Sequence, residues 1–498
     1  MIFCRLGGQG FVGCNHVYFG IYSGRKFARK RGHKSSMQNL FAVILAAGKG
    51  TRMKSKTHKV LHPVCGKPMV QHVIDQLHAI GTSKTIMVVG YLGETVKAKL
   101  SSEVLFVEQE QQLGTAHAVM QAKPLLQDIQ GTTIVLNGDH PLFTKETLQR
   151  LVETHQTSGA AATVLTAHMQ DATGYGRVVR YEDGSVERIV EHKDATDDEL
   201  LIQEINTGTF CFDNQKLFAA LEKVDNHNAQ GEYYLPDALS ILREGGERIS
   251  AEVIQDVNEA MGVNDRLQLA EAEKLMRERI LRGHMLNGVT IVHPENTYIE
   301  ADVVIGADTV IEPGCFLRGQ TVIGESCQIG PNADLRDVSV ADSSNISYTV
   351  MHESSIEKNA GVGPFVYVRS GTKLAEDVKI GCFVDLKKAE LGSGTKVAHL
   401  AYVGDAEVGE NVNIACGVVT VNYDGFRKHK TTIKDDSFVG CNVNLVAPVM
   451  LEKGSYVAAG STITDRVPED SFAIARQRQV TKEGYAKLLM EKIKDSNK

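Results

Sequence analysis

The chain has 498 residues, a formal net charge of −7 at neutral pH and a pI of about 6.2. It is too long for one ordinary hydrophobic core, so we expect two or three domains. The acidic balance argues against a general nucleic-acid binder, which needs a basic surface to displace counterions. No apolar run is long enough to cross a bilayer, so we expect no membrane-spanning segment.

Cysteine usage bears on the cellular compartment. There are 9 cysteines, an odd number, and none of them forms a C-x-x-C pair. This spacing is typical neither of a disulfide framework nor of a zinc ribbon. We therefore predict a reducing, cytoplasmic location.

The first 36 residues differ from the rest of the chain. They carry a cluster of basic residues: Arg25, Lys26, Arg29, Lys30, Arg31 and Lys34. They lack the uninterrupted apolar segment and the small-residue cleavage site of a signal peptide. One hypothesis is a basic arm for an anionic surface. We favour the other, a non-native leader before a start at Met37, because basic clusters are usually just solvated.

From residue 40 onwards, short apolar runs alternate with helical periodicity. Residues 41–45, 85–89 and 132–136 read as buried parallel strands. Apolar residues at i, i+3, i+4 and i+7 predict an amphipathic helix: Val70, Val73, Ile74 and Leu77. We predict a Rossmann-like α/β domain whose mostly parallel sheet binds ligands beyond the carboxyl ends of its strands. Residues 265–282 contain no Gly or Pro and predict a connecting helix.

Beyond that helix, aliphatic residues recur every six positions. The first series is Ile299, Ile305, Ile311, Leu317, Ile323, Ile329 and Leu335. The second is Val350, Ile356, Val362, Val368, Leu374, Ile380 and Leu386, and after shifts at Leu391 and Val408 a third is Ile433, Val439, Leu445, Leu451, Val457 and Ile463. This period predicts a parallel β-helix whose aliphatic residues point inward. Residues 336–349 and 420–432 break the repeat, and we predict loops there.

A glycine-rich turn follows the first predicted strand. Gly48 and Gly50 allow backbone N–H groups to approach phosphates, and Lys49 and Arg52 add positive charge. The turn is neither a Walker A loop nor a dinucleotide fingerprint. Asp139 ends another strand at the same edge of the sheet, where a carboxylate is either a helix cap or a Mg²⁺ ligand. Beside a phosphate loop we favour the metal.

Several short motifs then occur in order along the chain. They are Leu-x-x-Gly-x-Gly-Thr-x-Met at 45–53, Lys-Val-Leu-His at 59–62, Gln-Leu-Gly-Thr at 112–115, Gly-Tyr-Gly-Arg at 174–177, Glu-His-Lys-Asp-Ala at 191–195, Glu-Ile-Asn-Thr-Gly at 204–208 and Gly-Val-Asn at 262–264. From Met37 to the C-terminus the sequence resembles the bifunctional N-acetylglucosamine-1-phosphate uridyltransferase/glucosamine-1-phosphate acetyltransferase (GlmU) family.

The resemblance implies two activities that together make UDP-N-acetylglucosamine. Acetyl-CoA would acetylate glucosamine-1-phosphate, and UTP would then uridylylate the resulting N-acetylglucosamine-1-phosphate with release of pyrophosphate. The product would supply peptidoglycan, lipopolysaccharide or teichoic acid synthesis. The implied division is a nucleotidyltransferase at 37–264, a linker helix at 265–286, a left-handed β-helix at 287–475 and a basic tail at 476–498. The implied assembly is a homotrimer with acyltransferase sites between subunits.

For the first activity, the resemblance implies three sets of binding residues. UTP would contact Leu45, Ala46, Ala47, Gly48, Lys59, Gln109, Gly114 and Thr115. The sugar would contact Gly176, Glu191, Asn206 and Asn264, and Mg²⁺ would bind Asp139 and Asn264. His58 stands where Pro is common in the family, and His140 is a second departure, but neither removes a ligand.

For the second activity, the residues alone leave alternatives open. A lone histidine such as His399 is more often structural than catalytic, and Arg369, Lys387 and Lys388 read equally as an ordinary basic surface. The resemblance implies that His399 is the general base for the sugar amine, a task that suits a neutral imidazole. Glucosamine-1-phosphate would contact Arg369, Lys387, Tyr402 and Asn413. Acetyl-CoA would contact Cys416, Asn422, Tyr423, Cys441, Ala459 and Arg476, the two cysteines serving as packing or backbone positions and not as nucleophiles.

Two rival functions compete with this interpretation. One is a nucleotidyltransferase whose β-helix only oligomerises or regulates, as in the glucose-1-phosphate adenylyltransferase family. His399 and the Asn-Tyr-Asp-Gly motif at 422–425 argue against it. The other is a non-catalytic assembly subunit, like those of the eukaryotic translation-initiation exchange factor. Four intact residues argue against that one: Gly48, Lys59, Asp139 and Asn264.

Overall fold

The structure is a computed structural model that describes residues 39–100 and 104–496. The predicted leader, residues 1–36, lies outside these residues. Among the described residues, no helix has the length and apolar character that a membrane span requires.

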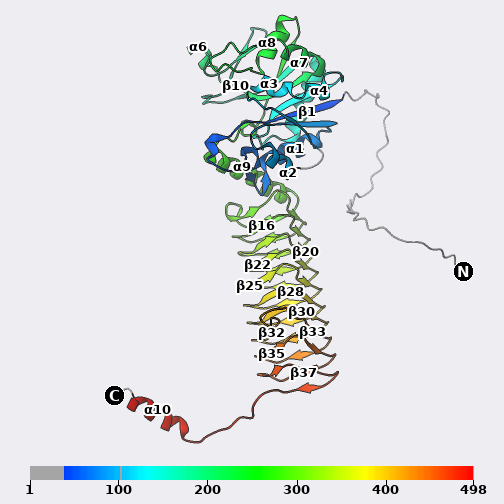
Figure 1. Cartoon of the computed structure of the whole chain (residues 1–498), viewed down its shortest axis with the longest axis vertical. Helices are drawn as coiled ribbons and strands as arrows, with labels where there is room; N and C mark the ends of the chain where they lie inside the picture. The colour runs from blue at the N-terminus through cyan, green and yellow to red at the C-terminus, as the bar shows by residue number, and fades with distance from the viewer. Residues whose placement is uncertain (1–38, 101–103, 497–498) are drawn as a thin grey trace, which may run out of the picture. The chain divides into compact units, whose positions relative to one another are not determined.

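The N-terminal domain is built on the predicted mostly parallel sheet (Figure 1). The strands run in the order β11-β7-β10-β6-β1-β4-β5, and β8 and β9 extend the sheet beside β10. The strands are β1 (Leu40–Ala46), β4 (Lys84–Val89), β5 (Leu105–Glu108), β6 (Thr132–Asn137), β7 (Ala162–His168), β8 (Arg177–Arg180), β9 (Val186–Val190), β10 (Glu204–Asp213) and β11 (Ile249–Val253). Strand β10 is antiparallel to both β6 and β7, whereas β1 is parallel to β4 and β6.

Helices cover both faces of this sheet because its central strands are apolar on both sides. In β1, Phe41 and Val43 belong to one buried cluster, whereas Ala42 and Ile44 belong to another. The first cluster is completed by α3 (Thr115–Met120), α7 (Asn214–Leu221) and α8 (Asp237–Glu244). The second is completed by the predicted amphipathic helix, α1 (Met69–Ala79), and by α5 (Lys145–Ser158). The two clusters fix the sheet between two helical layers.

Helix α9 (Arg266–Leu286) forms where a connecting helix was predicted. The side chain of Asp265 caps it by accepting hydrogen bonds from the N–H groups of Leu267 and Gln268, both at 2.9 Å. A hairpin of β2 (Pro63–Val64) and β3 (Lys67–Pro68) contacts the β-helix as well, because Lys67 pairs with Asp302 at 2.6 Å. The N-terminal domain and the β-helix are therefore joined both by helix α9 and by this contact of the hairpin.

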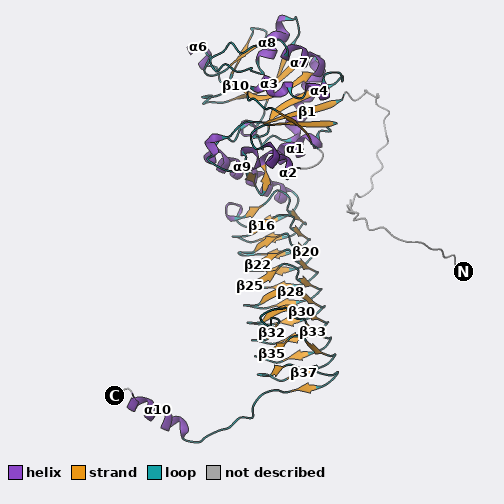
Figure 2. Ribbon diagram, in the orientation of Figure 1, coloured by secondary structure: helices purple, strands orange, loops and turns teal. Residues whose placement is uncertain are grey.

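After α9 the chain forms short strands and turns, as the six-residue repeat predicted (Figure 2). Ile299 pairs with Leu317, Ile305 with Ile323, and Ile311 with Ile329. Each pair is separated by three repeats, so one coil of the parallel β-helix has three faces. This architecture fits the left-handed form that the resemblance implied. The coil interior is one continuous aliphatic cluster.

Three series of strands form the faces of the β-helix. One is an 11-stranded sheet of β12 (Thr290–Ile291), β15 (Val310–Ile311), β18 (Gln328–Ile329), β21 (Asn345–Ile346), β24 (Gly361–Val362), β27 (Lys379–Ile380), β29 (Lys396–Val397), β31 (Asn413–Ile414), β34 (Phe438–Val439), β37 (Tyr456–Val457) and β39 (Phe472–Ala473). The other two faces belong to a 17-stranded sheet, which includes β22 (Thr349–His352), β25 (Val366–Arg369), β28 (Asp385–Leu391), β30 (Tyr402–Val408), β32 (Val419–Val421) and β33 (Thr431–Ile433).

The prediction of a loop at 336–349 was wrong. This segment contains β20 (Ser339–Val340) and β21, both in register with the coils on either side. Val350 does not point inward as predicted, because it is 39% exposed while Met351 is fully buried. The inward residues from Leu335 to Ile356 are Leu335, Val340, Ile346, Met351 and Ile356, so three of the four steps are one residue short. The six-residue spacing slips here while the stacking of strands does not. The second break, at 420–432, does contain a loop between β32 and β33.

Candidate active sites

The first site lies at the carboxyl ends of β1 and β6. Because Leu45 pairs with Asn137 in the sheet, the glycine-rich turn and Asp139 reach the same edge. A pocket of about 270 Å³ opens there. It is lined by all eight predicted UTP contacts, Leu45, Ala46, Ala47, Gly48, Lys59, Gln109, Gly114 and Thr115, together with Gly50, His58, Val60, Gln112, Ala118, Asn137, Asp139 and Glu232.

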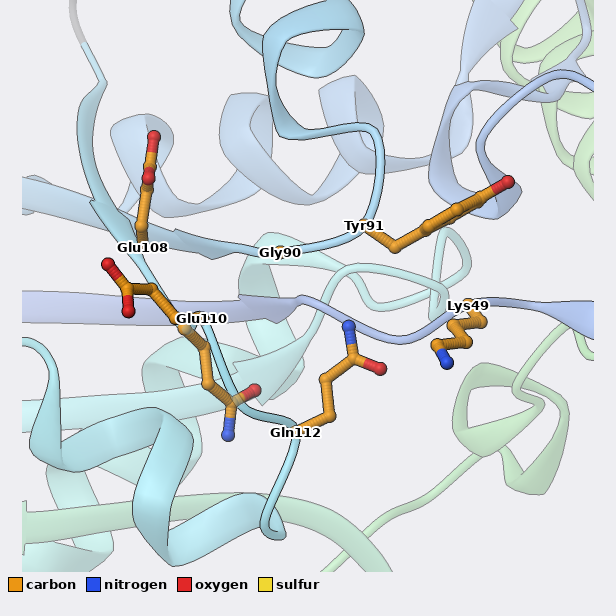
Figure 3. A pocket seen from close by; sticks show the side chains of 7 residues that line it. Lys49, Gly90, Tyr91, Glu108, Glu110 and Gln112 are labelled. Carbon is orange, nitrogen blue, oxygen red and sulfur yellow. The ribbon is translucent and has the colours of Figure 1, made fainter.

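A neighbouring cleft of about 510 Å³ extends this pocket (Figure 3). It shares Gln109 and Gln112 with the first pocket and is bordered by Lys49 and Tyr91. The amide of Gln112 donates to the carbonyl of Ala47 at 3.0 Å, which ties two walls of the nucleotide pocket together. Gln112 opens the Gln-Leu-Gly-Thr motif at 112–115 but was not among the predicted UTP contacts.

The predicted sugar contacts line a second pocket of about 460 Å³. They are Gly176, Glu191, Asn206 and Asn264. This pocket and the nucleotide pocket share four lining residues: Leu45, Thr115, Asn137 and Asp139. Two ligands bound in these pockets would therefore meet beside Asp139. Asn137, at the end of β6, was missed although it lies two residues before the aspartate that was singled out.

Asp139 belongs to a cluster of charges at this junction. Its carboxylate forms an ion pair with Lys59, and its Oδ1 lies 3.0 Å from Nδ1 of His140. Burial alone would raise the pKa of Asp139, but the hydrogen bond and charge of His140 and the ammonium of Lys59 outweigh it and hold the pKa well below its usual range. The group is therefore an ionised carboxylate at neutral pH.

The oxygens of this cluster fit a hard divalent cation. The ammonium of Lys59 contacts both the Asp139 carboxylate and, at 3.0 Å, Oδ1 of Asn264. One positive centre can thus reach both oxygens at once. Carboxylate and amide oxygens are the ligands that Mg²⁺ prefers, and a magnesium site with few protein ligands takes the remainder from phosphates and water. Among the described residues, no group of three or more His, Cys, Asp and Glu side chains offers an all-protein metal site.

His58 and His140, the two departures from the family pattern, lie beside this cluster. His58 precedes the short helical turn Lys59–Leu61, and its Nδ1 accepts a hydrogen bond from Val60 N at 3.4 Å. His140 stacks on Phe143 with ring centroids 5.5 Å apart. Both side chains are buried. They shape the walls around Lys59 and Asp139.

Acidic side chains lie near Glu191 in the wall of the second pocket. Burial, with the charges of Asp194 and Asp237, raises the pKa of Glu191. Burial, with the charges of Asp225 and Asp194, raises the pKa of Asp237 to about 6. These carboxyl groups are held close together, so each resists ionisation of its neighbours.

The second site lies on the β-helix, where one face brings together most of the predicted phosphate contacts. Arg369 on β25 lies opposite Lys387 on β28, and Arg369 also forms a bidentate ion pair with Asp385. Tyr402, on the next coil, pairs with Asp385 in register and accepts a hydrogen bond from Asn422 Nδ2 at 3.2 Å. Arg369, Lys387 and Tyr402 therefore lie together on one face of the coil.

Lys428 joins this face, although sequence reasoning missed it. It comes from the loop between β32 and β33, where Tyr423 and Lys428 form an isolated bridge. Its ammonium lies against that of Lys387 and lowers the pKa of Lys387. Two like charges held this close favour an anion between them. The only sequence signal near it was the break in the repeat at 420–432, where a loop was predicted.

The predicted base and most of the predicted acetyl-CoA contacts lie along an edge of the coil. Backbone hydrogen bonds join successive coils there: Gly417 N to His399 O at 3.2 Å, Asn442 N to Cys416 O at 2.8 Å, and Gly460 N to Cys441 O at 2.8 Å. Ala459 precedes Gly460, and the side chain of Arg476 lies beside Gly460. His399, Cys416, Cys441, Ala459 and Arg476 thus form one continuous row.

Three predicted contacts lie elsewhere in the chain. Asn413 is on β31, in the 11-stranded sheet, whereas Arg369, Lys387 and Tyr402 are on the 17-stranded sheet. Asn422 sits with Tyr402, and Tyr423 is 56% exposed on the loop. The predicted contacts of the second site therefore fall into two groups on the coil, and Asn422 and Asn413 do not lie with the rest of their predicted sets.

Comparison with known proteins decides the family. Residues 41–256 match the family model described as nucleotidyl transferase. The bifunctional protein GlmU of Brevibacillus brevis is 58% identical over 458 residues, covering 92% of this chain and 99% of that protein. The GlmU proteins of Geobacillus sp. and Geobacillus thermodenitrificans are 57% and 56% identical, covering 90% and 92% of this chain and 98% and 100% of theirs. The chain belongs to the GlmU family.

Membership confirms the predicted function. The protein is a bifunctional transferase that makes UDP-N-acetylglucosamine through acetyltransferase and uridylyltransferase activities. Its chemistry calls for a divalent metal and for nucleotide-sugar and acyl-CoA substrates. The match over nearly the full length of bifunctional relatives argues against both rivals, a regulatory β-helix and a non-catalytic subunit.

The raised pKa of Asp237 predicts a pH-dependent stability. An ordinary aspartate has a pKa of 3.8, whereas that of folded Asp237 is about 6, so the folded state holds this proton more tightly than the unfolded state. Below about pH 4 the group is protonated in both states and costs no stability. As the pH rises through about 6, the folded state must give up a proton that it holds more tightly than the unfolded state does, so its stability falls. Asp237→Asn should therefore raise the Tm at pH 8 by about 2 °C and change it little at pH 4.5. Thermal melts at both pH values, with the exposed Asp128→Asn as control, check this; equal shifts at both would contradict it.

Proposed function

We propose that UTP occupies the pocket lined by the glycine-rich turn and that N-acetylglucosamine-1-phosphate occupies the neighbouring pocket, with Mg²⁺ held by Asp139 and Asn264. The observation that carries this proposal is the wall shared by the two pockets, which contains Asp139. It brings the sugar phosphate and the nucleotide phosphates to one point. Bound there, the metal would neutralise phosphate charge and orient the reacting groups.

The protein groups supply the rest of this reaction. A phosphate oxygen of the sugar attacks the α-phosphorus of UTP, and pyrophosphate leaves. Lys59 and Arg52, which both donate to Asn264 Oδ1 at 3.0 Å, stabilise the negative charge that develops. Gly114 has a φ of 119°, and a Cβ there would lie 2.5 Å from Tyr233 O, so only glycine allows this wall to close.

For acetyl transfer, we propose that His399 is the general base and that Arg369, Lys387 and Lys428 hold the phosphate of glucosamine-1-phosphate. The row from His399 to Arg476 would hold acetyl-CoA. His399 takes a proton from the sugar amine as nitrogen attacks the thioester carbonyl, and CoA leaves as the thiol. This division assigns uridylyl transfer to residues 37–264 and acetyl transfer to residues 287–475. We also propose a cytoplasmic location, where these substrates and reduced cysteines coexist.

We further propose that the acetyltransferase site is completed in a homotrimer. Four large apolar side chains on successive coils stand exposed beside His399: Tyr348, Phe365, Phe383 and Leu400, at 41%, 53%, 57% and 60%. The rings of Phe365 and Phe383 stack with centroids 5.3 Å apart, and the ring of Tyr348 packs on Phe365 at a tilt, with centroids 5.2 Å apart. A contiguous apolar ridge of this kind favours a protein partner. A second copy docked there would bring its own substrate-binding face against His399.

Asp139→Asn should nearly abolish uridylyl transfer and leave acetyl transfer unchanged. The amide keeps the shape of the side chain but removes the charge that a divalent cation needs. Pyrophosphate release from UTP and N-acetylglucosamine-1-phosphate, measured across a Mg²⁺ titration, checks the first part, and free CoA release checks the second. Full uridylyl transfer at low Mg²⁺ would remove Asp139 from the site.

His399→Ala should lower the kcat of acetyl transfer by about a hundred- to ten-thousand-fold, because a general base is removed. The KM values should change little, since other residues hold both substrates. Uridylyl transfer from supplied N-acetylglucosamine-1-phosphate should persist. Near-normal acetyl transfer would make His399 a packing residue, and loss of both activities together with a lowered Tm would indicate misfolding.

Sedimentation of the full chain should report a trimer. Phe365→Lys combined with Phe383→Lys should dissociate it, because two charges cannot be buried unpaired in an apolar interface. The dissociated protein should lose acetyl transfer and keep uridylyl transfer. Lys373→Ala, on the exposed surface of the same coils, is the matched control. A wild-type monomer with full acetyl transfer would refute the site between subunits.

A further inference from the structure

His399 has a side-chain partner that the proposed reaction does not yet use. The thiol sulfur of Cys382 lies 3.1 Å from Nδ1 of His399, on the neighbouring coil. The two coils are joined at this point by a backbone hydrogen bond from Leu400 N to Cys382 O at 3.0 Å. Cys382 is half-buried, directly before the exposed Phe383. It was not among the residues singled out from the sequence.

The hydrogen bond made by one imidazole nitrogen determines whether the other nitrogen can accept a proton. A neutral imidazole carries one proton, so a group that accepts a hydrogen bond from Nδ1–H leaves the lone pair on Nε2. A base acting through Nε2 needs that tautomer and a fixed ring plane. The main chain of His399 is already held on both sides, because its carbonyl accepts from Gly417 N and Leu400 N donates to Cys382 O. The ring torsion is what remains to be fixed.

Among the described residues, Cys382 is the side chain that hydrogen-bonds His399. The other cysteines of this edge, Cys416 and Cys441, lie on later coils of the same row. The thiol of Cys382 therefore occupies the place that a carboxylate or carbonyl takes behind a histidine base in other sites. A sulfur acceptor is weaker than an oxygen, so its contribution should be modest.

We propose that Cys382 is a positioning residue for acetyl transfer: its sulfur accepts a hydrogen bond from Nδ1–H of His399 and directs Nε2 toward the amine of the sugar. When Nε2 takes the proton from the amine, the resulting imidazolium donates more strongly to the sulfur, so the contact is strongest as the reaction proceeds. Cys382 itself forms no covalent bond to the acetyl group. This inference rests on the proposed role of His399 as the base.

Two substitutions at this position separate positioning from packing. Cys382→Ala keeps the approximate size of the side chain but removes the acceptor, and Cys382→Asn supplies an amide oxygen as a new acceptor. For Cys382→Ala we expect the kcat of acetyl transfer to fall about tenfold, with both KM values within about twofold of wild type. Cys382→Asn should recover most of the loss. A packing residue would tolerate Ala and be disturbed by the larger Asn.

The controls use the full chain and both activities. Lys379→Ala changes an exposed side chain of the same coil and should leave both activities unchanged. Uridylyl transfer should be the same in every variant. Loss of acetyl transfer in Cys382→Ala and Cys382→Asn alike, with accumulation of an acetylated wild-type enzyme in the absence of sugar, would make Cys382 a nucleophile and overturn the proposal.

His399→Ala distinguishes the failure of this inference from the failure of the proposed function. If His399→Ala loses acetyl transfer while Cys382→Ala keeps the wild-type kcat, the positioning role is wrong and the base stands. If His399→Ala keeps acetyl transfer, the proposed function of this site is itself wrong. In the His399→Ala background, Cys382→Ala should cause no further loss of residual activity, because its effect acts through the imidazole.

Discussion

Both halves of this protein depend on one constraint, the alignment of neighbouring parallel strands. In the N-terminal sheet, pairing of Leu45 with Asn137 brings the glycine-rich turn and Asp139 to one edge. In the β-helix, pairing of Arg369 with Lys387 stacks residues 18 positions apart in the sequence. Hydrogen bonding of whole strands fixes these registers, and burial of alternate side chains prevents them from slipping. Each site is therefore held by rigid backbone, although its residues come from distant segments.

Positive side chains lie close together at both candidate sites. Lys59 and Arg52 both approach Asn264, and Lys387 lies against Lys428. Like charges this close repel one another in the absence of an anion, and a bound phosphate replaces that repulsion with charge-assisted hydrogen bonds. The carboxyl groups around Glu191 and Asp237 form an acidic surface, in contrast to these positive clusters. A sugar hydroxyl can donate to such carboxyl groups, whereas a phosphate is repelled by them.

The two sites differ in how completely one chain forms them. The nucleotide and sugar pockets share their walls within a single sheet edge. On the β-helix, Asn413 lies on a different sheet from Arg369 and Lys387, and an apolar ridge beside His399 stands open. A convex coil has no internal cleft, because its interior is filled by aliphatic side chains. Substrates of such a fold bind on its outer surface, where a second copy can supply the opposite wall.

The sequence by itself determined the fold class and the period of the coil, because periodicity reports which side chains are buried. Its motifs, through the family resemblance they carry, named many residues that line the N-terminal pockets, but not Gln112 or Asn137. It could not locate Val350 and Met351 correctly, since five-residue steps between Leu335 and Ile356 alter the spacing without breaking the stack. Nor could it find Lys428 beside Lys387 or Cys382 beside His399. Those contacts join neighbouring coils or a loop folded back on the coil, so only the tertiary structure decided them.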